Sequence, residues 1–135
     1  NVHPKICRWS VPGGTKVVNL DAVRARGTIE ADLDILGAMS DPAATVYVTH
    51  TPPYGTKLDV LYDGTPIGSH AVRAFIEKRR PPLTMHGHIH ESPQMSGSMH
   101  DRIGRTVSIN PGASIHGLQA VIFEARDPEK TLQVL

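Results

Sequence analysis

The stretch ATVYVTH, residues 44–50, is a continuous apolar run that ends in a polar tip. A short run of this kind, rich in β-branched residues, predicts a strand buried on both faces. Thr51 and the pair Pro52 and Pro53 follow directly, so the strand is expected to end at His50. Because open α/β sheets place ligands beyond the carboxyl ends of their strands, His50 is a candidate ligand.

A second stretch, LTMHGHIHES (residues 83–92), has a histidine at every second position, namely His86, His88 and His90. If this stretch is extended, residues two apart share one face, so the three imidazoles are expected on one face and the apolar residues on the other. Gly87 removes a side chain beside the histidines and would allow backbone or ligand to approach. The pattern favours a metal site, and the alternative is an exposed strand that merely contains histidines.

The rest of the chain alternates between strand and helix patterns. Thr28 is expected to cap a helix that Asp41 and Pro42 end, and Ser69 to cap another that ends before Pro81. The predicted elements are a hairpin of strands at 5–11 and 15–20, helices at 28–39 and 69–80, and strands at 44–50, 83–89, 105–110, 118–125 and 131–135. This order predicts an α/β or α+β sheet with helices packed on it.

Composition limits the classes of function. A chain of 135 residues with 39% hydrophobic residues is expected to form one domain, residues 1–135. The net charge of +1 gives no general field for nucleic acid or an anionic membrane, so affinity for phosphates would have to be local. Cys7 is the single cysteine, which excludes an internal disulfide, and no segment has the apolar length of a membrane span. We therefore expect a cytoplasmic protein.

Several polar residues have an ordinary structural interpretation. The segment NPGAS, residues 110–114, predicts a turn after a strand in which Gly112 has a positive φ. The isolated histidines at 3, 70, 100 and 116 are expected to be solvated or hydrogen-bonded. The cations Arg73, Lys78, Arg79 and Arg80 predict a solvated helix face and end.

Four motifs together resemble the C-terminal half of a calcineurin-like metallophosphoesterase. They are THTPPYGTKLD (49–59), GSHAVRAFIE (68–77), HGHIHES (86–92) and INPG (109–112), within a similarity from about residue 28 to about 125. The resemblance implies an α/β fold that is part of a four-layer α/β/β/α sandwich, with a central mixed β-sheet flanked by helices. It also implies two divalent metals at the carboxyl ends of the strands.

The same resemblance implies roles for individual residues. His50 and His88 would bind one metal and His90 the other. The residues that could support these ligands or contact substrate are His86, Gly87, Tyr54 and Asn110. Imidazole suits Mn, Fe, Co, Ni or Zn, so the ligands do not select the metal. Two such ions can activate a hydroxide and neutralise phosphoryl oxygens, which implies hydrolysis of phosphomonoesters or phosphodiesters.

The chain also departs from the family pattern. Family members have DxH, GD and GN motifs before the part that matches here, and none of these occurs among the 135 residues. We therefore expect the histidine-rich back half of a phosphoesterase, whose front half was cut away, is a separate chain or was lost. Such a chain should expose a strand edge and an apolar face, and should pair with the missing half or with itself.

Two alternatives remain open. One is a catalytically inactive metal-binding or interaction module that uses His50, His88 and His90 without hydrolysis. The other is a different metal fold with an HxH motif. A cupin places its Glu several residues beyond HxH, whereas Glu91 follows directly here, and a metallo-β-lactamase requires HxHxDH where this chain has HGHIHE.

Overall fold

The computed structural model describes residues 6–11, 13–19, 21, 25, 27–114 and 117–135. Its strands are β1 (Ile6–Val11), β2 (Gly14–Asn19), β3 (Val46–Val48), β4 (Leu83–Met85), β5 (His100–Ile103), β6 (Thr106–Ile109), β7 (Val121–Ile122) and β8 (Gln133–Val134). Its helices are α2 (Ile29–Met39), the 3-10 helix η1 (Pro42–Ala44), α3 (His70–Arg79), α4 (Ser92–Ser96) and α5 (Pro128–Thr131). None of the helices in these ranges is long and apolar enough to cross a bilayer.

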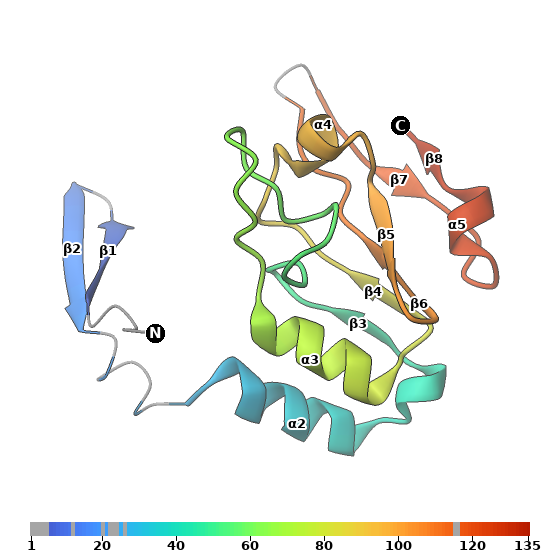
Figure 1. Ribbon diagram of the computed structural model, residues 1–135, viewed down its shortest axis with the longest axis horizontal. Helices are drawn as coiled ribbons and strands as arrows, with labels where there is room; N and C mark the ends of the chain where they lie inside the picture. Colours follow the sequence, from blue (N-terminus) through green and yellow to red (C-terminus); the bar gives the residue numbers. More distant parts are fainter. Residues whose placement is uncertain (1–5, 12, 20, 22–24, 26, 115–116) are drawn as a thin grey trace.

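A mixed four-stranded sheet lies at the centre, in the order β3-β4-β6-β5 (Figure 1). β3, β4 and β6 are parallel, and β5 pairs antiparallel with β6. Two separate antiparallel pairs, β1 with β2 and β7 with β8, complete the strands of the described residues. The expected α/β class, with a central mixed sheet and flanking helices, is confirmed, and so is the expected N-terminal hairpin.

Helices α2 and α3 begin where the sequence predicts. The Thr28 hydroxyl accepts a hydrogen bond from the backbone N–H of Ala31 at 3.2 Å, and the Ser69 hydroxyl accepts one from that of Val72, also at 3.2 Å. Each cap satisfies an N–H that the first helical turn leaves without a partner. Arg80 ends α3 in a left-handed conformation with φ 51°.

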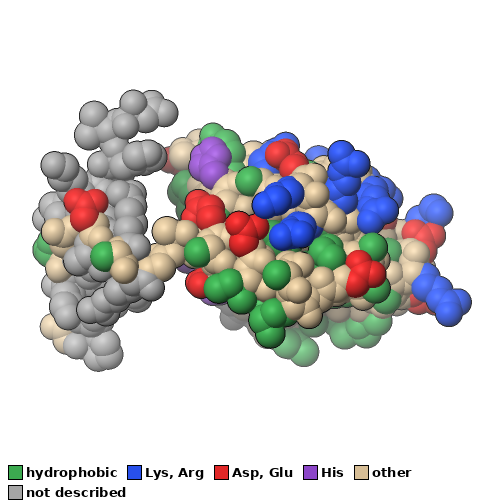
Figure 2. Space-filling model, turned by 90° about the horizontal axis from the view of Figure 1, so that it is seen from below, with side chains coloured by type: hydrophobic (Ala, Val, Ile, Leu, Met, Phe, Trp, Pro, Cys, Tyr) green, Lys and Arg blue, Asp and Glu red, His purple; other side chains and the backbone are tan. Residues whose placement is uncertain are grey.

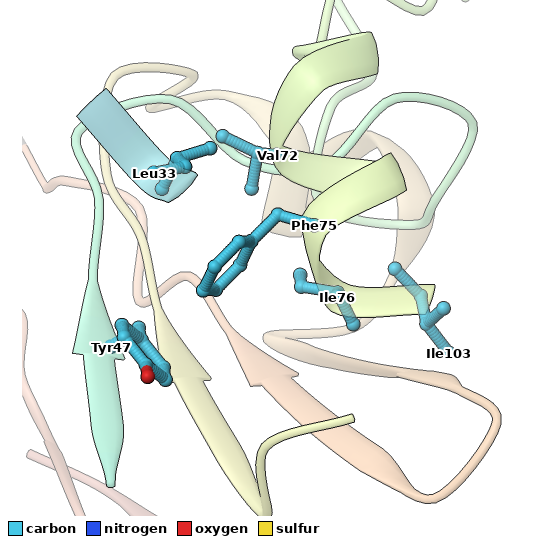
Figure 3. Packing of buried hydrophobic residues seen from close by; sticks show 6 residues of the cluster. All are labelled: Leu33, Tyr47, Val72, Phe75, Ile76 and Ile103. Carbon is cyan, nitrogen blue, oxygen red and sulfur yellow. The ribbon is translucent and has the colours of Figure 1, made fainter. Parts of the chain in front are cut away.

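One face of the sheet packs against these two helices. Tyr47 of β3 meets Phe75 of α3 edge to face, with ring centroids 4.9 Å apart (Figure 3). The Tyr47 hydroxyl remains hydrogen-bonded to Ser40 at 2.7 Å, which satisfies its buried polar group. Other members of this core are Leu33, Val72, Ile76 and Ile103.

The opposite face of the sheet is covered only in part. Leu83, Val107 and Ile109 form a second core beneath Val121, Phe123 and Leu132, which come from the β7–β8 region. This cover does not extend over β3, where Val46 and Val48 are 43% and 74% exposed. The prediction that β3 is buried on both faces is therefore wrong. β3 is one of the two edge strands of the four-stranded sheet, and of its three residues only Tyr47 is buried.

The predicted strand over residues 83–89 is also too long. β4 ends at Met85, and His88 has a positive φ of 64°, which breaks the extended backbone. The sequence patterns also missed α4, β5 and α5, because these elements have four or five residues each and no periodicity can develop over that length.

Candidate metal centre

Loops from three parallel strands meet at one edge of the sheet. His50 lies just after β3, His86 and His88 just after β4, and Asn110 just after β6. Parallel strands end at the same edge, so these residues come together although they are up to 60 positions apart. The N–H of Gly87 donates to the carbonyl of His50 at 3.0 Å and joins the first two loops directly.

The imidazoles of His50 and His88 are in direct contact. His50 Nε2 and His88 Nδ1 lie 3.0 Å apart, with ring centroids 4.7 Å apart and an interplanar angle of 62°. With metal–nitrogen bonds of about 2.0–2.1 Å, two imidazole nitrogens lie about 2.9 Å apart at a 90° ligand angle and about 3.4 Å apart at the tetrahedral angle. The observed separation therefore fits two ligands of one ion. Both side chains are exposed, so an ion could reach them from solvent.

His88 lies at the centre of a strained turn. The N–H of Ile89 donates to the carbonyl of Gly87 at 2.7 Å, which closes a γ-turn around His88 at φ 64°. A γ-turn with positive φ is rare, and an L-residue in a left-handed conformation costs about 1–2 kcal/mol. Strain of this kind persists where surrounding structure enforces it and is frequent at functional sites.

His90 does not join this pair. Its side chain is exposed, and among the residues the structure describes no three His, Cys, Asp or Glu side chains are placed to hold one ion. The expectation that His86, His88 and His90 share a face fails, because the γ-turn at His88 reverses the backbone between them. His50 and His88 are thus the two predicted ligands that this geometry brings together.

His86 is buried and belongs to the interior rather than to the rim. It is 6% exposed, with Nδ1 2.9 Å from the Thr49 hydroxyl and Nε2 2.8 Å from the Thr84 hydroxyl. Thr49 also donates to the carbonyl of Thr51 at 3.2 Å, and a hydroxyl has one proton to donate. This assigns the proton to Nδ1, with Nε2 accepting from Thr84. Burial lowers the pKa of His86 to about 4, opposed by hydrogen bonds to the backbone of Thr49 and Thr51, so the ring is neutral at pH 7.

Asn110 has a structural role in this geometry. It is fully buried, and its amide donates to the carbonyls of Leu58 and Ile89 at 3.1 and 3.0 Å. Its side-chain oxygen accepts from the N–H of Gly112 at 3.0 Å. These bonds hold three loops together, and substrate contact by Asn110 stays a prediction. Gly112 has the predicted positive φ of 72°, and a Cβ there would lie 2.7 Å from the carbonyl oxygen of His90.

Gly87 and Tyr54 are the other two candidates for supporting the ligands or contacting substrate. A Cβ at Gly87 would lie 3.9 Å from the His50 carbonyl oxygen, an ordinary contact, so the site does not require glycine there for space. The ring of Tyr54 stacks on that of His70 with centroids 3.9 Å apart and an interplanar angle of 27°. Arg73 fixes the Tyr54 backbone through a 2.9 Å bond from Nη1 to its carbonyl. Substrate contact by Tyr54 stays a prediction.

Asp59 is a residue that the sequence patterns did not single out. Its carboxylate is fully buried and accepts hydrogen bonds of 2.9 Å from the N–H groups of Gly55, Thr56 and Gly68. It therefore fixes the long loop that follows His50. The position of this Asp in a Pro/Gly-rich loop could have predicted its role, because short acidic side chains accept hydrogen bonds from nearby backbone N–H groups.

No family model matches the sequence, and no curated protein matches it. A solved structure aligns with 79% of this chain at a TM-score of 0.60 and 22% sequence identity. The match covers 38% of that structure's chain, so this chain corresponds to well under half of its length. At this identity the likeness shows a shared fold and nothing of activity.

Proposed function

We propose that this chain supplies the histidine part of a metal-dependent phosphoesterase site, in which His50 and His88 bind one divalent ion. The single observation that supports this best is the 3.0 Å separation of His50 Nε2 and His88 Nδ1 at the carboxyl ends of parallel strands. His90 is proposed as a ligand of a neighbouring ion. That second ion would need further ligands, because the described residues provide no group of three His, Cys, Asp or Glu side chains around His90.

The residues around the pair support this chemistry in specific ways. When bound, divalent ions such as Mn, Fe, Co, Ni or Zn would supply an activated hydroxide and neutralise phosphoryl oxygens. The bond from Gly87 N–H to the His50 carbonyl fixes the spacing of the two loops. For both facing nitrogens to bind an ion, the imidazole that donates the hydrogen bond between them must instead carry its proton on its outer ring nitrogen. Neutral His86 adds no positive charge behind them.

We further propose that the complete site belongs to a four-layer α/β/β/α sandwich acting on phosphate esters in the cytoplasm. The partly covered sheet face supports this, because exposed Val46 and Val48 lie where a further layer would pack. The partner would be an N-terminal segment with the DxH, GD and GN motifs, or a second copy of this chain.

A second candidate is a metal-binding or interaction module that does not hydrolyse phosphate esters. It is favoured by the absence of a carboxylate beside the histidine pair among the described residues. A bridging carboxylate holds the two ions of a hydrolytic site together, whereas two imidazoles can bind one ion weakly without one.

Hydrolysis assays separate the two candidates. p-Nitrophenyl phosphate and bis-p-nitrophenyl phosphate are tested with Mn or Ni, using the chain alone and with an N-terminal segment containing the three motifs fused or added. Activity in the longer form supports the phosphoesterase, and metal uptake without activity in either form supports the module. If His88→Ala keeps both the activity and the metal content of the parent, His88 is not part of the site.

A further inference from the structure

A group of arginines lies at the opposite end of the sheet from the histidine pair. Two grooves of about 340 and 420 Å³ meet there and share Arg105 in the β5–β6 turn. They are lined by the end of α3, by the β5–β6 turn and by the loop around residue 126. Seen from below, the right-hand half of the molecule carries many Lys and Arg side chains, with Asp and Glu among them (Figure 2).

The acidic residues in these grooves already have partners. Glu77 binds Arg73 at 2.9 Å, Asp127 binds Lys130 at 2.9 Å, and Glu129 binds Arg102. The pKa of Asp127 is lowered by Lys130, and that of Glu129 by Arg102, as expected for neutralised carboxylates. The remaining cations are Arg80, Arg105 and Arg126, whose guanidinium groups have no ion pair with a carboxylate among the described residues.

The conformation of Arg80 indicates that this positive charge has a use. Arg80 occupies the left-handed position that ends α3, at φ 51°, where glycine is strongly preferred. Arg105 donates from Nε to the Arg80 carbonyl at 2.9 Å, so the Arg105 side chain is held against the end of α3. Charge near a helix C-terminus explains a cation here, but it does not explain why the strained position itself holds one.

The surroundings of these arginines narrow the class of ligand. Among the described residues no Phe, Tyr, Trp or His lines either groove, so bases have no ring there to stack on. The large apolar side chains that line the grooves, Ile103 and Val107, are 7% and 4% exposed, so among the described residues the grooves present no large apolar side chain that could insert into a bilayer. Guanidinium groups bind phosphate oxygens through paired N–H donors. We propose that this arginine group, Arg80, Arg105 and Arg126, binds the phosphate backbone of duplex nucleic acid without reading its sequence.

Binding of two unrelated fluorescent DNA duplexes to the full chain tests this by anisotropy at increasing salt. The expected result is equal affinity for both duplexes and a log–log salt dependence of slope about 3, one unit for each arginine. Arg80→Gly should weaken binding about fivefold and lower the slope by about 1. It relaxes the positive φ of residue 80, so thermal stability should not fall. The Arg126 side chain makes no ion pair with the described residues, so Arg126→Gln should weaken binding to a similar extent.

Lys57→Gln is the matched control, because Lys57 is an exposed cation in the loop after β3, outside both grooves. It should bind duplex as the parent does. The proposal is overturned by absence of salt-dependent binding, by equal weakening in the Lys57 control, or by parent-like binding of both arginine variants. Tighter binding to anionic vesicles or to an acidic polypeptide than to duplex would overturn it too. This experiment measures neither metal content nor phosphoesterase activity. A failure of the proposed phosphoesterase function would therefore leave the nucleic-acid proposal standing.

Discussion

Replacing His88 by glycine should separate strain from ligand function at the candidate metal centre. His88 lies in a γ-turn at φ 64°, and its imidazole contacts His50 at 3.0 Å. His88→Gly and His88→Ala both remove the imidazole. Only glycine removes the conformational cost, so the two variants differ mainly in the backbone energy of residue 88.

The magnitude follows from two opposing terms. A left-handed L-residue costs about 1–2 kcal/mol, and glycine loses about 0.5–1 kcal/mol more conformational entropy on folding than alanine. His88→Gly should therefore be more stable than His88→Ala by about 0.5–1 kcal/mol, or about 2–5 °C in melting temperature for a chain of this size. Both variants should lose metal uptake relative to the parent chain.

Urea unfolding with a chelator present, followed by far-ultraviolet circular dichroism, measures this difference. Metal content after incubation with Mn or Ni measures the ligand role separately. If His88→Ala is as stable as His88→Gly, the strained turn is not present in solution. If His88→Gly retains full metal uptake, His88 is not a ligand.

Three further perturbations test other parts of the structure. Because burial lowers the pKa of His86 from 6.5 to about 4, its contribution is present above pH 6.5 and is lost as pH falls toward 4. The free energy of unfolding should fall by up to about 3 kcal/mol across that window, and His86→Asn should show less of this fall. Gly68→Ala places a Cβ 2.7 Å from Asp59 Oδ2 and should destabilise the chain by about 1–3 kcal/mol, whereas Gly87→Ala should be close to neutral in thermal melts. Sedimentation should show self-association of the parent chain that Val48→Lys weakens about tenfold, since Val48 is 74% exposed on the edge strand; a monodisperse parent monomer would refute this.

Much of the fold could be predicted from local patterns. Thr28 and Ser69 cap the helices as expected because capping depends on a side chain and a backbone N–H within three residues. The positive φ of Gly112 follows similarly from turn chemistry. The exposure of Val48 could not be predicted from the run of apolar residues around it, because exposure depends on which strand occupies the sheet edge.

The candidate site was predictable in position more than in geometry. The order of elements placed His50 and His88 at one rim, since parallel strands end together. The alternation of histidines over 86–90 misled, because the period-two rule holds only in extended backbone and the chain turns at His88. The spacing of the histidines does not show that His86 is buried while His88 and His90 are exposed. That difference depends on the hydroxyls of Thr49 and Thr84, which come from two different strands or strand ends.

The Thr84–Ser108 hydrogen bond has a consequence for how strictly this rim is built. The two hydroxyls lie 2.8 Å apart inside the core, at directly paired positions of β4 and β6, and Thr84 continues to His86. If β6 slipped by one residue, Val107 or Ile109 would be paired with Thr84, and the buried hydroxyls of Thr84 and Ser108 would lose their bond to each other. Correct alignment of β4 with β6 therefore also sets how far the two following loops extend beyond the sheet edge, so a slip of β6 would move Asn110 away from the Ile89 carbonyl that it binds after β4.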